Sequence, residues 1–220
     1  PLHLEEKNGF SCTGAELEPL VTRRTKIVYI NFPSNPTGGV ATMEQLEGIA
    51  EVIRRKASPD VRVYSDEVYE CILFDGHVHR SIASVPGMEE RTIVVSGASK
   101  TYSWTGGRLG WAVFPTAREA AHFKNLNINY YSCVPAYNQM GAKVAIESPE
   151  SIPEIRKMVS AFEERRNVVV KGLNEIPGIT CQMPKGAFYV FTNVGGVCEQ
   201  VGAFAAYGSL PADVRARTSP

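Results

Sequence analysis

The sequence predicts an α/β fold in which a mainly parallel sheet is flanked by helices. Short β-branched runs are each followed by turn residues and then by apolar residues at helical spacing, through the first two thirds of the chain. The 220 residues are 44% apolar and 21% charged, enough for one large domain and part of another. We therefore expect a large domain over residues 1–150 and the beginning of a smaller α+β domain over residues 151–220.

Four segments fit the expected strands. Residues 27–31 (IVYIN) form a short apolar run that the Pro and Gly of FPSNPTGG bring to an end. Residues 61–64, 92–96 and 109–114 have the same character, and each of the first two leads directly into polar residues. Later in the chain, ITCQM and AFYVF suggest two short strands of the smaller domain.

The helices are indicated by apolar spacing and by their first residues. Thr42 with Gln45 forms a capping-box pattern ahead of an apolar face, and Ser151 with Glu154 repeats that pattern before a long helix. We expect the charged EERR stretch of this long helix, residues 163–166, to face solvent. Further helices are expected over residues 117–126 and after Pro135, since proline suits a first helical turn.

Charge and cysteine content restrict the possible partners. Lys plus Arg equals Asp plus Glu at 23 each, so no net field attracts nucleic acid or an anionic membrane surface. No apolar run approaches the roughly 20 residues that cross a bilayer. The five cysteines are scattered without a CxxC pair, which favours a reducing cytoplasm and no zinc site. The His77-x-His79 pair has no further ligands at suitable spacing, so we expect no metal.

Both ends of the sequence look like cuts through a longer chain. The first residue is Pro1, and the last segment is polar and lacks a closing element. We therefore expect further segments on both sides.

Four polar segments follow the predicted strands or lie between them. They are NPTG at residues 35–38, SDEVY at 65–69, SK at 99–100 and TGGR at 105–108. Ligands of open α/β sheets bind beyond the carboxyl ends of the strands, so these segments are the candidates for chemistry. Each is weak alone, because such turns are common on protein surfaces.

Their order and separation resemble those of the fold-type I aminotransferases, the aspartate aminotransferase superfamily. NFPSNPTGG, YSDEVYE and SGASKTYSWTGGRLGW occur in the family's order, and Arg108 follows Lys100 by eight positions in a TG-x-R-x-G context. GAFYV after Lys185 is similar to the first strand of the family's small domain. The resemblance extends to about Asn193.

The resemblance implies pyridoxal 5'-phosphate (PLP) as cofactor and Lys100 as the catalytic residue. The lysine amine of such enzymes forms an imine (Schiff base) with the coenzyme aldehyde and later carries a proton between substrate and coenzyme. Asp66 matches the aspartate that keeps the pyridine nitrogen protonated.

Four further residues match the family's coenzyme contacts. Tyr69 and Asn35 match the donors to the phenolic oxygen of the coenzyme. Arg108 and Ser99 match its phosphate ligands, and a guanidinium suits phosphate because it binds through two nitrogens.

By the same resemblance, the expected reaction moves an amino group from an amino acid to a 2-oxo acid. An aspartate-like, aromatic or broad range of donors is expected, and so is a homodimer. The family's substrate-carboxylate arginine has no match, because Arg215 and Arg217 stand in a different context, RAR. The family's N-terminal phosphate turn and stacking aromatic are not found either.

Two alternatives keep the same coenzyme residues or the same fold. A PLP-dependent lyase or synthase such as a C–S lyase shares every residue named above. A non-catalytic, aminotransferase-like effector domain of a transcriptional regulator requires a helix-turn-helix region upstream.

Overall fold

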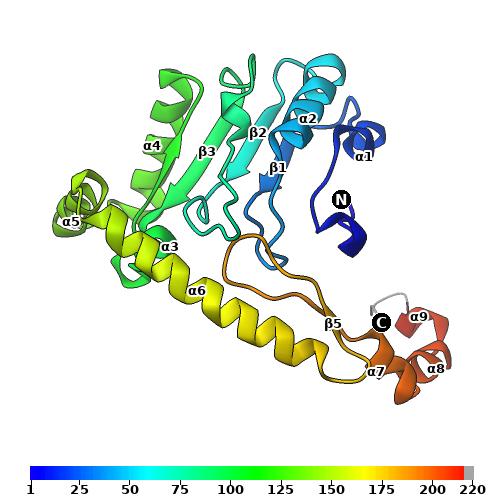
Figure 1. The fold of residues 1–220 in the computed structure, drawn as a ribbon. Helices are drawn as coiled ribbons and strands as arrows, with labels where there is room; N and C mark the ends of the chain where they lie inside the picture. The colour runs from blue at the N-terminus through cyan, green and yellow to red at the C-terminus, as the bar shows by residue number, and fades with distance from the viewer. Residues whose placement is uncertain (216–220) are drawn as a thin grey trace.

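A four-stranded sheet forms the centre of the protein in its computed structural model, which describes residues 1–215. The strand order is β1-β2-β3-β4 (Figure 1). The strands β1 (Ile27–Asn31), β2 (Arg62–Asp66) and β3 (Thr92–Gly97) run parallel, whereas β4 (Gly110–Val113) is antiparallel to β3. The prediction of a mainly parallel sheet is therefore confirmed.

The strands differ from their predicted ranges mainly at the ends. β2 runs two residues past residue 64, because Ser65 and Asp66 pair with residues of both β1 and β3. The hydrogen-bond ladder does not depend on side-chain polarity, so it continues where the apolar run has stopped. Asp66 is consequently the last residue of a strand rather than part of a loop.

Helices lie on both sides of the sheet and lead away from it (Figure 1). α4 extends five residues past the predicted end at residue 126. Short 3-10 turns occur at Glu6–Asn8, Glu18–Leu20, Ile82–Ser84 and Thr105–Gly107. The α-helices are α1 (Gly14–Leu17), α2 (Met43–Lys56), α3 (Ala98–Thr101), α4 (Ala117–Tyr131), α5 (Ala136–Glu147), α6 (Ser151–Asn174), α7 (Gly195–Gln200), α8 (Ala203–Gly208) and α9 (Ala212–Arg215). Within residues 1–215 none of these helices combines the length and the hydropathy that a membrane crossing requires.

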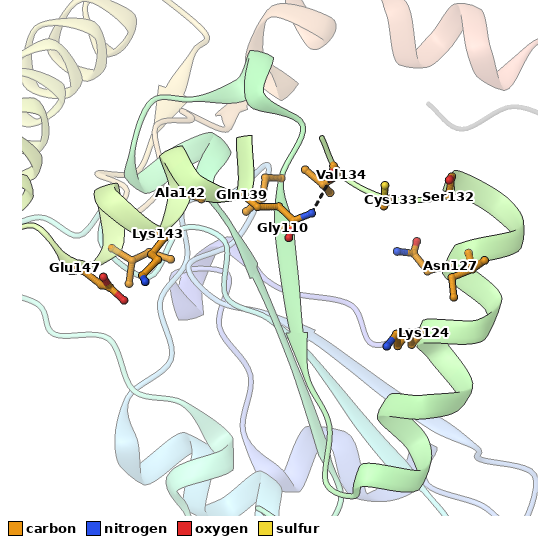
Figure 2. Close-up of a pocket in the computed structure, with 13 residues that line it drawn as sticks. Gly110, Lys124, Asn127, Ser132, Cys133, Val134, Gln139, Ala142, Lys143 and Glu147 are labelled. Atoms are coloured by element: carbon orange, nitrogen blue, oxygen red, sulfur yellow. Dashed lines mark hydrogen bonds between the residues drawn. The ribbon is translucent and has the colours of Figure 1, made fainter. Parts of the chain in front are cut away.

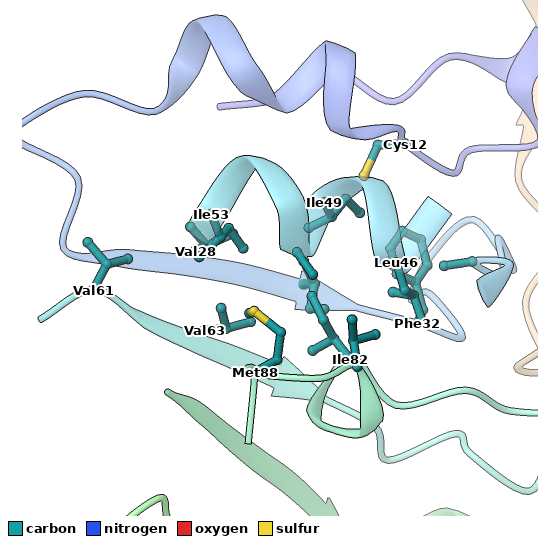
Figure 3. Packing of buried hydrophobic residues seen from close by; sticks show 14 residues of the cluster. Cys12, Val28, Phe32, Leu46, Ile49, Ile53, Val61, Val63, Ile82 and Met88 are labelled. Carbon is teal, nitrogen blue, oxygen red and sulfur yellow. The ribbon is translucent and has the colours of Figure 1, made fainter. Parts of the chain in front are cut away.

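α2 covers one face of the sheet, and its predicted capping box is present. The Thr42 hydroxyl accepts the Gln45 amide N–H at 3.2 Å, and the Gln45 side chain accepts the Thr42 N–H at 2.8 Å. The helix then turns an apolar face inward, and Ile49 is fully buried. Figure 3 shows this face directed at Val28 of β1 and Val63 of β2.

α6 begins differently from the prediction, and the second capping box is wrong. Glu150 precedes the helix with already helical dihedrals, φ −70° and ψ −20°, and no side chain caps the first turn. The preceding turn explains this start, because the Ser151 N–H donates to the Ser148 carbonyl at 3.2 Å. A capping hydroxyl acts from an extended residue, and here the chain enters the helix from a turn.

The EERR stretch of α6 is not a uniformly solvated face, so that prediction is wrong for Arg166. This residue is only 7% exposed. Its guanidinium donates to both carboxylate oxygens of Asp75, at 2.7 and 2.9 Å, and to the Pro184 carbonyl at 3.0 Å. Arg166 also lies over the Phe74 ring, 4.7 Å from its centroid. The stretch therefore attaches α6 to the segment that follows β2.

The C-terminal part contains less strand than predicted. β5 (Thr180–Cys181) and β6 (Thr192–Asn193) form a two-residue antiparallel pair, and AFYVF at residues 187–191 is not a strand. The Ala187 N–H donates to the Ile72 carbonyl at 2.9 Å, and Ala187 has a positive φ of 57°. This segment thus takes its hydrogen bonds from residues 72–74 and not from a neighbouring strand. Arg217, one of the two terminal arginines, lies outside the described residues.

Candidate active site

The predicted site residues gather where the parallel strands end. Asp66 is the last residue of β2, Asn35 follows β1 by four positions, and α3 with Lys100 starts directly after β3. Because parallel strands present their carboxyl ends at one edge of a sheet, three distant segments meet there.

Lys100 is held half-buried against aromatic rings. Its Nζ atom lies 5.1 Å from the ring centroid of Phe188 and 5.5 Å from that of Tyr69. α3 is a single turn that begins after Gly97, so the lysine follows the buried strand within three residues. The fold therefore fixes the amine at the sheet edge, in contact with residues from two other segments.

Tyr69 is one of the most buried large side chains, at 2% exposure. Its hydroxyl shares a 2.6 Å hydrogen bond with the Tyr189 hydroxyl. Burial raises the pKa of Tyr69, and the bond to Tyr189 and the charge of Asp66 raise it further. The phenol is therefore a proton donor at neutral pH. Phe188 and Tyr189 were missed as site residues, although the aromatic pair in GAFYV was a visible signal.

Asp66 and Asn35 are connected through Asn31, which was also missed. The Asn31 side-chain amide donates to the Asp66 carbonyl at 3.3 Å, and its carbonyl oxygen accepts the Asn35 N–H at 2.8 Å. The Asp66 carboxylate accepts the Val68 N–H at 3.3 Å and the Tyr29 hydroxyl at 3.1 Å. A polar residue ending the apolar run IVYIN was the signal for Asn31.

Ser99 of α3 and Arg108, which follows the 3-10 turn Thr105–Gly107, are linked by Thr105. The Thr105 hydroxyl donates to the Ser99 carbonyl at 3.1 Å, and Arg108 Nη1 donates to the Thr105 carbonyl at 2.9 Å. Arg108 has a left-handed backbone, φ 49° and ψ 42°, and its side chain is exposed. Hydrogen bonds through Thr105 thus connect the two predicted phosphate ligands within residues 99–108.

The NPTGG turn is fixed against the GAFYV segment by close backbone contact. The Gly38 carbonyl accepts the N–H groups of Lys185 and Gly186, both at 3.1 Å. Gly38 has φ +70°, and a Cβ there would lie 2.3 Å from the Pro184 Cβ. Only glycine fits such a position. This contact holds the aromatic pair at residues 188–189 next to the strand ends.

Glu67, between Asp66 and the VY pair, has a fully satisfied buried carboxylate that sequence reasoning did not anticipate. Ser65 and Ser81 donate to its Oε1 at 2.8 and 2.6 Å, and His79 Nε2 lies 2.7 Å from its Oε2. Burial by itself raises the pKa of Glu67, but the bonds from His79, Ser81 and Ser65 outweigh it and hold that pKa below the ordinary value. Side-chain atoms of Glu67, Glu70 and His79 that are of a type able to bind a metal ion lie within 4.8 Å of one another. Both Glu67 oxygens already have hydrogen-bond partners among Ser65, Ser81 and His79.

A surface pocket of about 600 Å³ lies between α4 and α5 (Figure 2). Lys124 and Asn127 of α4 face Lys143 and Glu147 of α5 across it, and none of the six predicted site residues lines it. The residues predicted for the chemistry therefore do not line this pocket.

Known proteins resemble this chain over most of its length. The family model described as aminotransferase class I and II matches residues 1–206. An aromatic-amino-acid aminotransferase of Thermococcus litoralis is 40% identical over 191 residues, which are 86% of this chain and 47% of that protein. An aspartate aminotransferase of Geobacillus stearothermophilus is 38% identical over 196 residues, 88% of this chain and 48% of that protein.

A solved structure gives the same result. The aromatic aminotransferase from Pyrococcus horikoshii superposes with a TM-score of 0.81 at 37% identity, covering 87% of this chain and 50% of that one. The chain thus spans about half the length of the relatives it matches. The match covers nearly all of these 220 residues and includes every motif at the sheet edge. The chain belongs to the class I and II aminotransferase family.

Proposed function

We propose that the complete protein is a PLP-dependent aminotransferase that moves an amino group from an amino acid to a 2-oxo acid, with Lys100 as its catalytic residue. The observation that carries this proposal is the half-buried Lys100 amine at the end of β3, over the rings of Tyr69 and Phe188. A lysine amine in an apolar setting at a ligand-binding edge is suited to act as a nucleophile and a base.

The donor set at the sheet edge fits PLP chemically. The coenzyme requires an amine for its aldehyde, a carboxylate for its ring nitrogen, neutral donors for its phenolic oxygen and a cation for its phosphate. Lys100 and Asp66 supply the first two. Asn35 and Tyr69 supply the neutral donors, and the Arg108 loop with Ser99 supplies the phosphate contacts. PLP, when bound, acts as a sink for the electrons of the bond that breaks at the substrate Cα.

The residues of this chain have distinct tasks in the proposed reaction. The Lys100 amine would hold the cofactor, and as a free base it would carry the proton that leaves the substrate Cα. The Tyr69 hydroxyl stays protonated at neutral pH because its pKa is raised, so it donates a hydrogen bond throughout. Asp66 remains the counter-charge of the ring nitrogen.

Substrate and assembly are parts of the same proposal. The relatives described above are named for aspartate and for aromatic amino acids. We accordingly propose an acidic or aromatic amino acid as donor. We also propose a cytoplasmic homodimer, with a large domain to about residue 150 and the beginning of the small domain after it.

Covalent labelling tests the assignment of Lys100. The complete protein is incubated with PLP, reduced with borohydride and mapped by peptide mass spectrometry. The label is expected on Lys100 and absent from the Lys100→Ala variant, which should also lack the absorption band that the bound cofactor produces near about 400 nm. A label on another lysine, or on none, contradicts the proposal.

Product analysis separates transamination from the alternatives. A transaminase converts 2-oxoglutarate to glutamate in the presence of a donor amino acid, whereas a C–S lyase releases pyruvate and ammonia from cystathionine. Neither product forms if the protein is only an effector domain. All three relatives described above are named aminotransferases, which favours the first outcome.

A further inference from the structure

Tyr29 reaches the carboxylate of Asp66 from the neighbouring strand. Its position in β1 pairs with Tyr64 of β2, and Asn31 pairs with Asp66. Since alternate residues of a strand face the same side, Tyr29, Tyr64 and Asp66 share one face of the sheet. The Tyr29 hydroxyl donates to Asp66 Oδ2 at 3.1 Å.

The ring of Tyr29 is fixed by stacking. Its centroid lies 5.5 Å from that of Tyr64, and the two rings are inclined by 24°. Stacking limits rotation of the ring, so the hydroxyl is directed at the carboxylate although Tyr29 is 60% exposed within the described chain.

The two oxygens of the Asp66 carboxylate each have a donor from a different segment. Oδ2 accepts from Tyr29 of β1, and Oδ1 accepts the Val68 N–H of the turn after β2 at 3.3 Å. Two donors at opposite oxygens fix the plane of a carboxylate. A carboxylate has about four acceptor positions, so places remain for a further donor such as a protonated ring nitrogen.

Tyr29 is suited to donate over a wide pH range. Burial and the adjacent Asp66 charge raise its pKa to about 12. The hydroxyl therefore keeps its proton under all conditions in which an enzyme of this kind is assayed, and Asp66 remains the acceptor.

We infer that Tyr29 is a positioning residue, which holds the Asp66 carboxylate in the orientation that receives the ring nitrogen of the cofactor. This inference rests on the proposed function. Tyr29 touches neither substrate nor cofactor in this role; it acts through Asp66. The residue lies in the IVYIN run, where a sequence pattern alone assigns it only to a strand.

Replacement by phenylalanine removes the hydroxyl and keeps the stacked ring. In the complete protein, Tyr29→Phe is expected to raise the dissociation constant of PLP by about three- to tenfold, as measured by absorbance titration of the apoprotein. Tyr64→Phe is the matched control, because its ring belongs to the same stack and its hydroxyl has no hydrogen bond to Asp66 within the described residues. The control should change the constant by less than about twofold.

A double-mutant cycle distinguishes positioning from general support of the fold. If Tyr29 acts through Asp66, Tyr29→Phe has less than about a twofold effect when Asp66 is already alanine. The inference is overturned if Tyr29→Phe raises the dissociation constant of PLP by the same factor with Asp66 present and with Asp66 replaced by alanine. It is also overturned if Tyr29→Phe alone leaves that constant unchanged. Borohydride labelling of the unaltered protein distinguishes failure of the proposed function from failure of the role of Tyr29. A missing label on Lys100 refutes the proposed function. A labelled Lys100, together with an unchanged PLP dissociation constant in Tyr29→Phe, refutes only the role of Tyr29.

Discussion

Two clusters hold this protein together by different means. Around α2, the contacts are almost entirely hydrocarbon, and Ile49, Ile53 and Val63 are fully buried. Around α6, aromatic rings including Tyr69 and Phe162 pack beside an ion pair between the buried Arg166 and the exposed Asp75. The comparison shows that apolar packing stabilises the sheet against α2, whereas the attachment of α6 next to the candidate site depends on charge and on directed hydrogen bonds.

The largest expected effect is in the α2 cluster. Ile49→Ala removes a fully buried side chain and should lower the free energy of unfolding by about 2–5 kcal/mol, because it leaves a cavity. Urea denaturation measures the change. Glu51→Ala, an exposed position on the same helix, should stay within about 0.5 kcal/mol. Equal effects at the two positions would mean that α2 does not pack as described.

Substitution of Arg166, in the ion pair of the α6 cluster, should have the next largest effect on stability. Arg166→Met keeps much of the length and loses the donors to Asp75 and Pro184, so we expect about 1–3 kcal/mol of destabilisation. Arg165→Met, one position earlier and exposed, should cost less than about 0.5 kcal/mol. The same urea assay compares the two variants. A small effect at both positions would restore the interpretation of EERR as a solvated face.

Substitutions at the first residues of α2 and α6 should have smaller effects on stability. Thr42→Ala removes a complete capping box and should destabilise by about 1 kcal/mol. Ser151→Ala removes a side chain that makes no capping bond and should cost less than about 0.5 kcal/mol. Thermal midpoints of both variants test this pair, and a larger shift for Ser151→Ala would contradict the observed start of α6.

The smallest expected effect is a change of folding stability with pH in the acid range. The Arg166 guanidinium donates to Asp75 and holds the pKa of that carboxyl below its ordinary value. Since folding lowers this pKa, the stabilisation is complete above the pKa of the unfolded chain and disappears as the pH falls through the folded value. Glu67, with a lowered pKa, contributes in the same direction.

The difference between the unfolding midpoints of the wild type and of Arg166→Met should therefore become smaller as the pH falls below about 4. Both proteins contain Glu67, so their difference removes its contribution, and the lost bond to the Pro184 carbonyl does not vary with pH. A constant difference between them over the acid range would show that Asp75 does not respond to Arg166.

The sequence predicted the elements whose signals are local. The capping box at Thr42 and the apolar face of α2 were predicted because helix starts and helical spacing depend on residues within a few positions. Ser151 carried the same motif and failed, because the turn at Ser148 had already fixed the entry to α6. A motif predicts a cap only when the chain before it is extended.

The candidate site required contacts that no local pattern contains. Lys100 and Asp66 stood in recognisable motifs, but the partners of Tyr69 and Asp66 were not predicted. Tyr189 lies 120 positions from Tyr69, and Tyr29 lies 37 positions before Asp66. Arg166 was misjudged for the same reason, since its partner Asp75 is 91 positions away. Pairing between distant residues depends on the topology of the fold, which local patterns in a single sequence do not reveal.

The bond between the hydroxyls of Tyr69 and Tyr189 has a consequence for the order of events during synthesis. A ribosome adds about 5–20 residues per second, so Tyr189 is translated roughly 6–24 seconds after Tyr69. Once β4 has been translated, and until residues 188 and 189 are added, the nascent chain has its sheet strands and its lysine, but neither Tyr189 nor Phe188, the second ring beneath the amine. These two rings therefore join the environment of Lys100 only after residues 188 and 189 have been added, and a chain that stops before them carries the lysine motif without these rings.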